Sequence, residues 1–457
     1  MQQKSKESGK SKGRAFIYPK KPAGKLYNYR KWVSYTLLAL LFSSPFLKFR
    51  GEQLILLNFL ERKFVFFGLI FTPQDFYLFA LAMLIFIMFI VCFTVVLGRL
   101  WCGWLCPQTI FMEMVFRRIE YWIEGDANQQ RKLDQQSWNT EKVIKKGSKH
   151  LIFMVISFCI ANTFLAYIIG SDLLIKIITE PISEHLSGFI SIWLFTFIFY
   201  GIFAYVREVV CTVICPYGRL QGVLLDNQSL VVAYNTSRGE PRGRIQKNNP
   251  SAHLGDCIDC GLCVQVCPTG IDIRKGTQLE CVNCTACIDA CNEVMLKIER
   301  PKSLIGFYNQ DFIKYKKPYK IGLKALGYTA VLFIVLLVFS SLIYKRENVQ
   351  TTVLRASGTL YQNRANGKVS NLYNAELINK TNKPIKFQFR AKQKDDEIEF
   401  IQKAIILPKE ATIQITFFLI RKQAHIKTYK SDAEFEVIAD GKVLSNATTS
   451  FFAQPDN

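Results

Sequence analysis

The stretch CIDCGLCVQVCP, residues 257–268, decides the fold together with CVNCTACIDAC, residues 281–291. Each run has the spacing CxxCxxCxxxC, in which three closely spaced cysteines are followed by a distal fourth. This spacing is typical of bacterial ferredoxins, and two such runs predict two [4Fe-4S] clusters. The sequence therefore predicts an electron carrier with a bacterial-type two-cluster ferredoxin domain.

The fourth cysteine of each run is expected to ligate the cluster of the other run, because the turn that places the first three cannot also reach the far iron. Pro268 follows the first run as the pattern requires, whereas Asn292 stands where a second proline is usual. We name the two expected ligand sets the first quartet and the second quartet. They are, respectively, Cys257, Cys260, Cys263 and Cys291, and Cys281, Cys284, Cys287 and Cys267.

The main alternative to clusters is a pair of zinc sites, because CxxC pairs also bind zinc. Zinc usually takes four thiolates from two CxxC pairs, so two triple runs with a distal cysteine favour cubane clusters. Disulfides are not expected if the runs lie in a reducing compartment.

The composition is typical of a membrane protein with soluble parts attached. The chain has 457 residues, enough for two or three domains, and is 50% hydrophobic with 36 phenylalanines. The net charge of +22 could indicate nucleic-acid binding. However, the basic residues gather beside apolar segments and form no recognisable nucleic-acid module, so we expect no nucleic-acid partner.

The N-terminal segment is strongly basic. Its first 31 residues carry ten Lys or Arg residues against the single acidic Glu7. We interpret it as a cytoplasmic tail held near anionic lipid. No apolar stretch precedes residue 32 and no small-residue cleavage site is evident, so a cleaved signal peptide is not expected.

Five segments are apolar and, at about twenty residues, long enough to cross a bilayer as helices. The segment 54–71 carries three consecutive charges at its centre, Glu61 to Lys63, which would be costly at mid-bilayer. We expect it to form an interfacial or extracytoplasmic hairpin. The five expected spans, of which the first is marginal, are residues 32–49, 76–97, 151–170, 188–206 and 321–344.

Loop charges predict the orientation of the spans. The loop 102–149 holds eight Lys or Arg residues, whereas the loop 171–187 holds only Lys176. Because basic loops stay in the cytoplasm, the N-terminus and both cysteine runs are expected inside, and the C-terminal part outside. We predict a multi-pass protein of the bacterial inner, cytoplasmic membrane.

The C-terminal part of the chain changes to alternating short pieces such as NAELIN, IKFQFRA, TIQITFFLI and AEFEVIA. Turn signals separate them at Asn366-Gly367, at residues 382–384 and at Asp440-Gly441. This pattern predicts a small antiparallel sandwich of immunoglobulin-like type.

The expected organisation is a multi-domain membrane protein with five parts. They are a basic cytoplasmic tail at 1–31, a four-helix membrane domain at 32–225, a cytoplasmic 2[4Fe-4S] ferredoxin domain at 226–320, a transmembrane helix at 321–344 and a periplasmic all-β immunoglobulin-like sandwich at 345–457.

A second cysteine pattern is an internal repeat of the form CxxxCP. It occurs in GRLWCGWLCPQT, residues 98–109, and in VREVVCTVICPYGR, residues 206–219. Residues i and i+4 share one helix face, so each pair presents two sulfurs side by side, and each following proline should break or kink its helix. Two such helices facing each other would gather four thiols into one redox-active metal site: Cys102, Cys106, Cys211 and Cys215.

Soft thiolates suit Cu(I), zinc or another iron-sulfur cluster. The alternative is that these thiols are small hydrophobes in apolar helices, which is how we interpret Cys92 and Cys159. A duplicated pair with the same proline, on alternate spans, favours a site.

Several neighbours of the CxxxCP pairs are lesser candidates. Met112 and Met114 could offer thioethers to copper or fill a helix face. Glu113 could carry protons or cap an interface. Three charged residues bracket the second pair and either bias its thiols toward ionisation or mark topology: Arg207, Glu208 and Arg219.

Together the basic N-terminus, the paired CxxxCP helices, the double ferredoxin run, the last span and the sandwich resemble the FixG/RdxA/CcoG family. These membrane-bound polyferredoxins are accessory proteins for assembly of the cbb-type cytochrome c oxidase. The resemblance covers nearly the whole chain. It implies an oxidoreductase that reduces Cu(II) to Cu(I) for insertion into the oxidase. It also implies a cytoplasmic electron donor, partners among oxidase assembly factors or copper transporters and chaperones, and compatibility with a homodimer.

Two rival functions remain open on the sequence alone. The first is an electron-transfer subunit that exchanges electrons with quinol and feeds a periplasmic reductase, without metal cargo. The second is a non-enzymatic redox scaffold or sensor that uses the sandwich as its binding module.

Overall fold

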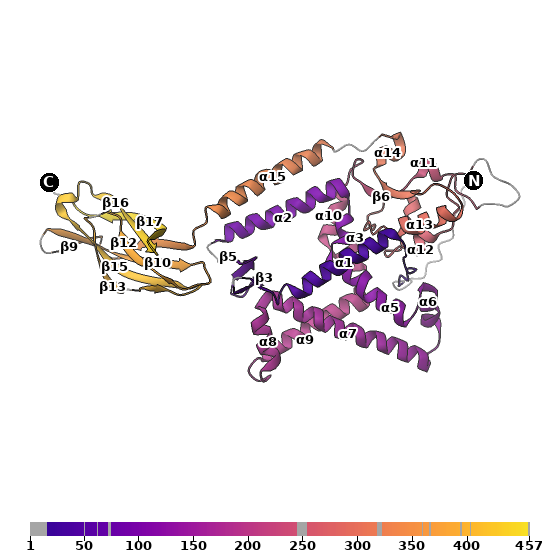
Figure 1. Ribbon diagram of the computed structural model, residues 1–457, viewed down its shortest axis with the longest axis horizontal. Helices are drawn as coiled ribbons and strands as arrows, with labels where there is room; N and C mark the ends of the chain where they lie inside the picture. The colour runs from indigo at the N-terminus through magenta and orange to yellow at the C-terminus, as the bar shows by residue number, and fades with distance from the viewer. Residues whose placement is uncertain are drawn as a thin grey trace. The chain divides into compact units, whose positions relative to one another are not determined.

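The structure is a computed structural model (Figure 1). It describes residues 16–49, 51–61, 63–71, 75–244, 254–317, 322–358, 360–364, 367–393, 395–402 and 404–455. The chain divides into two compact units. The cysteine-rich unit comprises Met1–Ser43, Met83–Ala166 and Asp172–Leu336, and the sandwich unit comprises Ser44–Ala82, Tyr167–Ser171 and Leu337–Asn457.

The helical elements carry the labels of Figure 1, where η2 to η4 are π-helical and η5 and η6 are 3-10 helices. They are α1 (Lys25–Ser43), α2 (Phe76–Leu97), α3 (Leu100–Trp104), α4 (Pro107–Ile110), η2 (Phe111–Phe116), α5 (Arg117–Ile123), α6 (Ala127–Gln135), α7 (Thr140–Ile169), α8 (Ser171–Thr179), α9 (Leu186–Gly201), η3 (Ile202–Val206), η4 (Val210–Ile214), α10 (Pro216–Leu224), α11 (Thr236–Gly239), α12 (Leu262–Gln265), η5 (Ile273–Lys275), α13 (Ala286–Lys297), α14 (Gln310–Tyr315), α15 (Leu323–Tyr344) and η6 (Gln423–His425).

No described strand before residue 349 is longer than four residues, whereas β10, β15, β16 and β17 each have ten or more. The described strands are β1 (Lys48–Phe49), β2 (Glu52–Gln53), β3 (Ile55–Asn58), β4 (Lys63–Phe66), β5 (Leu69–Phe71), β6 (Val231–Tyr234), β7 (Ile305–Tyr308), β8 (Val349–Arg355), β9 (Gln362–Arg364), β10 (Lys368–Asn379), β11 (Ile385–Lys386), β12 (Gln388–Ala391), β13 (Glu397–Gln402), β14 (Ile406–Leu407), β15 (Thr412–Lys422), β16 (Lys430–Ala439) and β17 (Lys442–Phe452).

Among the described residues, four helices are long and apolar enough to cross a membrane: α2, α7, α9 with its continuation η3, and α15. They match four of the five expected spans. The first expected span, 32–49, is different: α1 begins at Lys25 and ends at Ser43, and Lys48 already lies in β1. The N-terminal turns of α1 contain polar residues such as Arg30, so the helix lacks an apolar stretch long enough to cross a bilayer.

The segment 54–71 forms the expected hairpin, extended by a third strand. Strands β3, β4 and β5 pair antiparallel in that order, and Leu56, Val65 and Ile70 form a small core. Lys63 is ion-paired to Glu52 at 3.0 Å, so its charge is balanced within the protein. Arg62 lies outside the described residues.

The C-terminal strands form two antiparallel sheets that bury a common core. One sheet has the order β13-β15-β10-β8 with β9 also on β10, and the other has the order β12-β16-β17. All four alternating pieces singled out in the sequence lie on strands of these sheets or of the small β11-β14 pair. Alternation places every second side chain in the core, as β16 shows with its regular pattern of buried and part-exposed residues.

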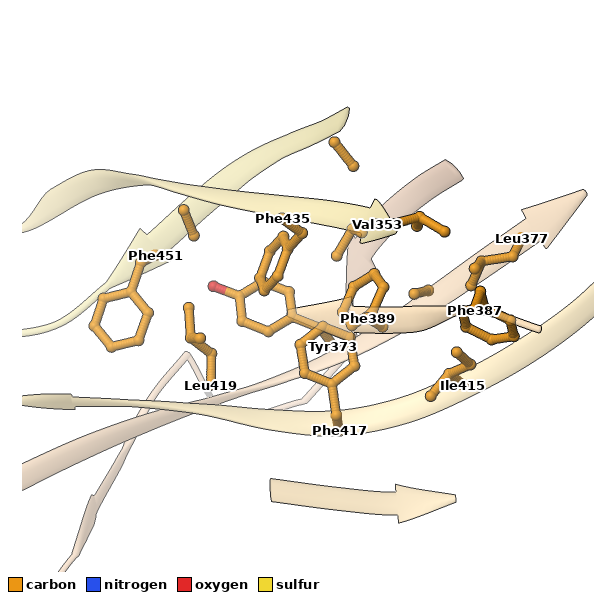
Figure 2. Close-up of a cluster of buried hydrophobic side chains, with 14 of the residues drawn as sticks. Val353, Tyr373, Leu377, Phe387, Phe389, Ile415, Phe417, Leu419, Phe435 and Phe451 are labelled. Carbon is orange, nitrogen blue, oxygen red and sulfur yellow. The ribbon is translucent and has the colours of Figure 1, made fainter. Parts of the chain in front are cut away.

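Aromatic rings fill the centre of the sandwich. Figure 2 shows Tyr373, Phe389, Phe417 and Phe435 gathered between the strands. The rings of Phe417 and Phe435 meet edge to face with centroids 5.3 Å apart, and those of Phe389 and Phe435 stack at 5.4 Å. The buried Tyr373 hydroxyl donates a hydrogen bond to the Ser450 carbonyl at 2.9 Å, which satisfies its polar end.

The turn residues predicted from the sequence lie between strands of the sandwich wherever the structure describes them. Asp440 and Gly441 connect β16 to β17 with φ values of 49° and 74°, the left-handed pair that a tight hairpin turn requires. Residues 382–384 separate β10 from β11 as expected. Gly367, φ 63°, precedes β10, whereas its expected turn partner Asn366 lies outside the described residues.

Residues 16–31 pack against protein instead of forming a free tail. The Lys20 amide donates to the Gln265 carbonyl at 2.7 Å, and the Tyr27 amide donates to the Asp289 carboxylate at 2.8 Å. The buried Asp289 thereby caps the start of α1 from α13. The described part of the basic N-terminal segment therefore packs on α12 and α13. Residues 1–15 lie outside the described part.

Candidate metal centres

The two quartets line two neighbouring cavities. Cys257, Cys260, Cys263 and Cys291 line the first together with apolar side chains from the β6 and β7 region. The second quartet lines the other cavity, where Cys263 is also present, so that thiol lies between the two. The distal cysteine of each run is thus brought to the other run's cavity, the arrangement that the spacing predicted.

The backbone turns in the same unusual way in both runs. Two positions in each run have positive φ, namely Asp259 at 53° and Gly261 at 69°, and Asn283 at 50° and Thr285 at 66°. Three of these four residues are not glycine, so the conformation carries strain. Alternating right- and left-handed residues aim successive N–H groups into one concavity, a backbone nest that binds anionic iron-sulfur centres. The donor set and the backbone both fit cubane clusters.

Asn292 accounts for the departure from the ferredoxin pattern. Cys267 and Pro268 follow the end of the short helix α12, whereas α13 continues past Cys291 to Lys297. A proline at position 292 would remove a backbone hydrogen bond from the interior of α13. Asn292 instead accepts a hydrogen bond from the Ser303 amide at 2.8 Å and holds the following loop.

Burial shapes the acid-base behaviour of the thiols. It raises the pKa of Cys281 and Cys291 to about 12 and that of Cys263 to about 11. These three thiols are therefore protonated at neutral pH when no metal is bound. A metal that binds thiolates must displace these protons, which couples loading to proton release.

Each CxxxCP motif breaks its helix between the two cysteines. Cys102 lies in α3, but Cys106 has an extended conformation, φ −65° and ψ 123°, and Pro107 starts α4. The second motif repeats this: Cys211 lies in η4, Cys215 has φ −68° and ψ 113°, and a proline starts α10. The break is as predicted, but the shared helix face is not. The residue before a proline disfavours helix, so each pair straddles the break.

The structure brings the two CxxxCP pairs together. Burial raises the pKa of Cys102 to about 12, reinforced by Cys106 and Cys211, and it raises that of Cys211 to about 12, reinforced by Cys106 and Cys215. The Cys102 thiol also donates a hydrogen bond to Gln221 Oε1 at 3.3 Å. Cys106 is therefore near thiols of both motifs, but no three of these four sulfurs, all of which the structure describes, lie within 4.8 Å of one another.

The second quartet packs directly against the first CxxxCP helix. Cys102 contacts the apolar cluster that contains Val282 and Cys284 and that Cys287 also borders. A Cβ on Gly103 would lie only 2.4 Å from the Val282 carbonyl oxygen, so only glycine allows this approach. Cys102 thus packs against the same small apolar cluster as Cys284 and Cys287 of the second quartet.

The lesser candidates separate into distinct roles. Met112 lines a pocket together with Cys211 and Glu113, whereas the buried Met114 does not. Arg117 binds Glu113 and Glu208 in a buried ion-pair group, so neither acid is isolated. Arg219 has no ion pair among the described residues.

Arg207 binds Glu120 through both terminal nitrogens, at 2.7 and 2.8 Å. Its charge is therefore used in an ion pair, not on the neighbouring thiols.

Sequence reasoning missed the residues that surround these thiols, chiefly Arg30, Arg99 and Gln221. Arg30 is one of ten basic residues among the first 31, and nothing in its neighbours along the chain distinguishes it. Its role depends on contacts between segments far apart in sequence, since its Nε donates to the Gly103 carbonyl at 2.7 Å.

Three family models match the chain. One described as a 4Fe-4S dicluster domain covers residues 206–310, and one described as a 4Fe-4S binding domain covers residues 79–125. The third, described as an IG-like fold at the C-terminal of FixG, covers residues 339–454. These matches identify iron-sulfur domains and confirm the immunoglobulin-like fold. Each of the two 4Fe-4S matches also includes one CxxxCP pair.

Curated relatives match over much of the chain. Protein RdxB of Cereibacter sphaeroides is 32% identical over 396 residues, 83% of this chain and 82% of the relative. The nitrogen fixation protein FixG of Rhizobium meliloti is 38% identical over 304 residues, 64% of this chain and 56% of the relative. The chain thus spans little more than half of that FixG. A crystal structure of a FixG-related protein from Vibrio parahaemolyticus aligns with 23% of the chain at 16% identity and a TM-score of 0.21.

Proposed function

Because the chain belongs to the FixG/RdxA/CcoG family of iron-sulfur electron-transfer proteins, we propose that it is a membrane-bound cupric reductase. It reduces Cu(II) to Cu(I) for assembly of a cbb-type cytochrome c oxidase. The observation that carries this proposal is that Cys102 of the first CxxxCP motif packs against the same apolar cluster as Cys284 and Cys287 of the second quartet. An electron-carrying centre and a soft metal site adjoin in one unit.

The two quartets are the residues that hold the clusters. Their four-sulfur linings, their backbone nests and the two 4Fe-4S family matches support this assignment. A [4Fe-4S] cluster, when bound, supplies one electron at a time, which is what reduction of Cu(II) to Cu(I) consumes.

Copper is the substrate of the CxxxCP thiols. Thiolates hold Cu(I) more readily than the harder Cu(II), so Cys102, Cys106, Cys211 and Cys215 favour the reduced product. Their burial raises the pKa of Cys102 and Cys211, so copper binding releases protons. Met112 lines the pocket beside Cys211 and offers a thioether as a further soft donor.

The remaining parts of the proposal concern location and partners. We place the quartets on the cytoplasmic side of a bacterial inner membrane and the sandwich on the periplasmic side, as the loop charges favour. A cytoplasmic donor supplies electrons, and an oxidase assembly factor or a copper chaperone receives the metal.

A copper titration tests this function. Purified, reduced Cys102→Ala and Cys211→Ala variants should keep the iron content of the wild type but lose stoichiometric copper binding and Cu(II) reduction, followed with a Cu(I)-chelating dye. Cys92→Ala and Cys159→Ala are matched controls, because they remove thiols from α2 and α7 outside the site. Unchanged copper affinity and rate in the CxxxCP variants would remove copper chemistry from these thiols.

A quinol-linked electron-transfer subunit is the second candidate. One observation favours it: the pocket beside Cys211 is lined by Glu113 and Glu208, and quinol oxidation needs acceptors for protons. Both acids bind Arg117, however, which gives them a structural role. A cluster-dependent rate with quinol that does not require copper, in the same purified protein, would establish this alternative.

A further inference from the structure

Five arginines are buried in the described part of the chain, and they fall into two classes. Three are ion-paired: Arg117 with Glu113 and Glu208, Arg207 with Glu120, and Arg421 with Asp396. The other two, Arg30 at 1% exposure and Arg99 at 5%, have no acidic side chain within ion-pair distance among the described residues.

Arg30 reaches from α1 to the contact between the second quartet and α3. Its Nε donates to the Gly103 carbonyl, while its Nη2 is buried without a hydrogen-bond partner. Gly103 in turn packs on the backbone between Cys281 and Cys284, because a Cβ there would lie 2.4 Å from the Val282 carbonyl oxygen and 2.9 Å from that of Asn283. The capping of α1 by Asp289 fixes the helix, so Arg30 cannot withdraw to solvent without moving α1.

Arg99 reaches the same place from the other side. It directly precedes α3, and its Nε is also buried without a partner. Its neighbour Gly98 packs against Asn283, whose Nδ2 would lie 3.1 Å from a Cβ at that position, and the Arg99 carbonyl accepts from the Gly103 amide at 3.3 Å. Arg99 is therefore next in the chain to a residue that packs on the second cysteine run, and its backbone is bonded to the residue after Cys102.

Two neutral donors complete this arrangement. Asn283 accepts from the Val232 amide with Oδ1, and its Nδ2 is buried without a partner. Gln221 accepts from Cys102 with Oε1, and its Nε2 is likewise unpartnered. Buried donors without acceptors cost free energy, and buried charges cost more, unless a negative group lies among them.

The first quartet has a different charge environment. Arg274 lines the cavity of this quartet, but it binds Asp272 at 2.7 Å and also Asp259. Its positive charge is thus balanced by carboxylates. The second quartet lies beside two cations that form no ion pair among the described residues, and the acid that acts on Cys284, Glu113, is itself ion-paired to Arg117.

We propose that Arg30 and Arg99 are the charge partners of the second quartet and hold the reduction potential of its cluster above the value that the thiolate set alone would give. They are positioning residues, because they act on the cluster through the field at its ligands. A fixed cation stabilises the added electron more than the oxidised state, so it raises the potential. The proposal rests on the proposed function only for the presence of two clusters, and it holds whether copper or quinol is the reaction partner.

A redox titration followed by electron paramagnetic resonance tests the proposal in the full-length protein. The signal that disappears in Cys267→Ala identifies the second quartet. In Arg30→Gln and in Arg99→Gln, that signal should titrate at a more negative potential, with a larger shift in the double variant. The signal of the first quartet should stay in place. Iron and sulfide analysis confirms that both clusters are present.

Matched variants separate charge from shape. Arg30→Lys and Arg99→Lys keep the positive charge and should titrate close to the wild type. Arg274→Gln removes a balanced cation and should change the second-quartet signal little. Unchanged potentials in fully loaded glutamine variants would overturn the proposal. If the glutamine variants lose the second cluster, the lysine variants decide: full loading at the wild-type potential supports a role of charge, and loss of the cluster there refutes it.

Discussion

The cysteine-rich unit and the sandwich unit are stabilised by different kinds of interaction. The sandwich buries aromatic and aliphatic side chains between paired strands, and its core contains no cysteine. The cluster-bearing part of the other unit contains eight cysteines, of which Cys257, Cys263 and Cys284 are buried, together with strained turns and buried arginines without carboxylate partners. These features are unfavourable in an empty protein and favourable around bound clusters. The comparison teaches that one unit is stabilised by packing and the other by its ligands.

Removing a cluster ligand is the strongest test of this difference. Cys267→Ala should lose about four of about eight iron atoms and the matching sulfide, because the distal cysteine belongs to the second quartet. The spectrum of the first quartet should persist. Hydrogen exchange should rise around residues 281–291, since strained turns without a cluster relax, and should stay unchanged in the sandwich. Loss of only the first-quartet signal would show that the ligand assignment is wrong.

A core truncation in the sandwich tests the other half of the comparison. Phe435 is 1% exposed and packs on three other rings, so Phe435→Ala should cost about 3–5 kcal/mol of stability. The loss should show as faster hydrogen exchange in β16 and β17, with iron content unchanged. Val443→Ala, at a half-exposed position of β17, is the control and should change stability by less than about 0.5 kcal/mol. A comparable iron loss in Phe435→Ala would contradict the independence of the two units.

A smaller, pH-dependent effect comes from a balanced charge in the sandwich unit. Asp75 is 1% exposed and binds Lys380 and Arg346, each at 2.6 Å. Burial acts to raise the pKa of Asp75, but these two cations outweigh it and hold the pKa below its ordinary value. The stabilisation is therefore complete above the unfolded pKa of about 3.9 and is lost as the pH falls through the lower folded pKa.

Asp75→Asn should accordingly cost about 1–3 kcal/mol at neutral pH and little in strong acid. Unfolding followed from pH 7 downward should show a weaker acid dependence than in the wild type. An acid dependence identical in the variant and the wild type would exclude Asp75 as its source.

The sequence predicted most of the sandwich because its signals are local. Alternation fixes which side chains face the core, and Asp440-Gly441 can adopt the left-handed conformations of a tight turn. The two quartets could be predicted equally well from the sequence, since the cysteine ligands of [4Fe-4S] clusters follow a fixed spacing along the chain. In both cases, neighbouring residues carry the information.

The arrangement around the CxxxCP thiols could not be predicted from neighbouring residues in this way. The CxxxCP repeat predicted the cysteines of the site and the breaks in the helices. It also predicted that both cysteines of a pair share one helix face, which is wrong because Cys106 and Cys215 have an extended conformation. The close fit of Gly103 against Val282 and the approach of Arg30 are contacts between distant segments. No periodicity within a single sequence reports such contacts.

The capping of α1 by Asp289 has a consequence for biogenesis. Tyr27, whose amide receives this cap, precedes the carboxylate by 262 residues. The ribosome therefore synthesises α1 long before it synthesises Asp289. Until α13 folds, the N–H groups in the first turn of α1 lack this carboxylate as a hydrogen-bond acceptor. Since α13 also carries Cys287 and Cys291, a nascent chain completes the seating of its first helix only together with the segment that receives iron. Insertion of the clusters and docking of the N-terminal helix α1 are thus coupled in one late step of folding.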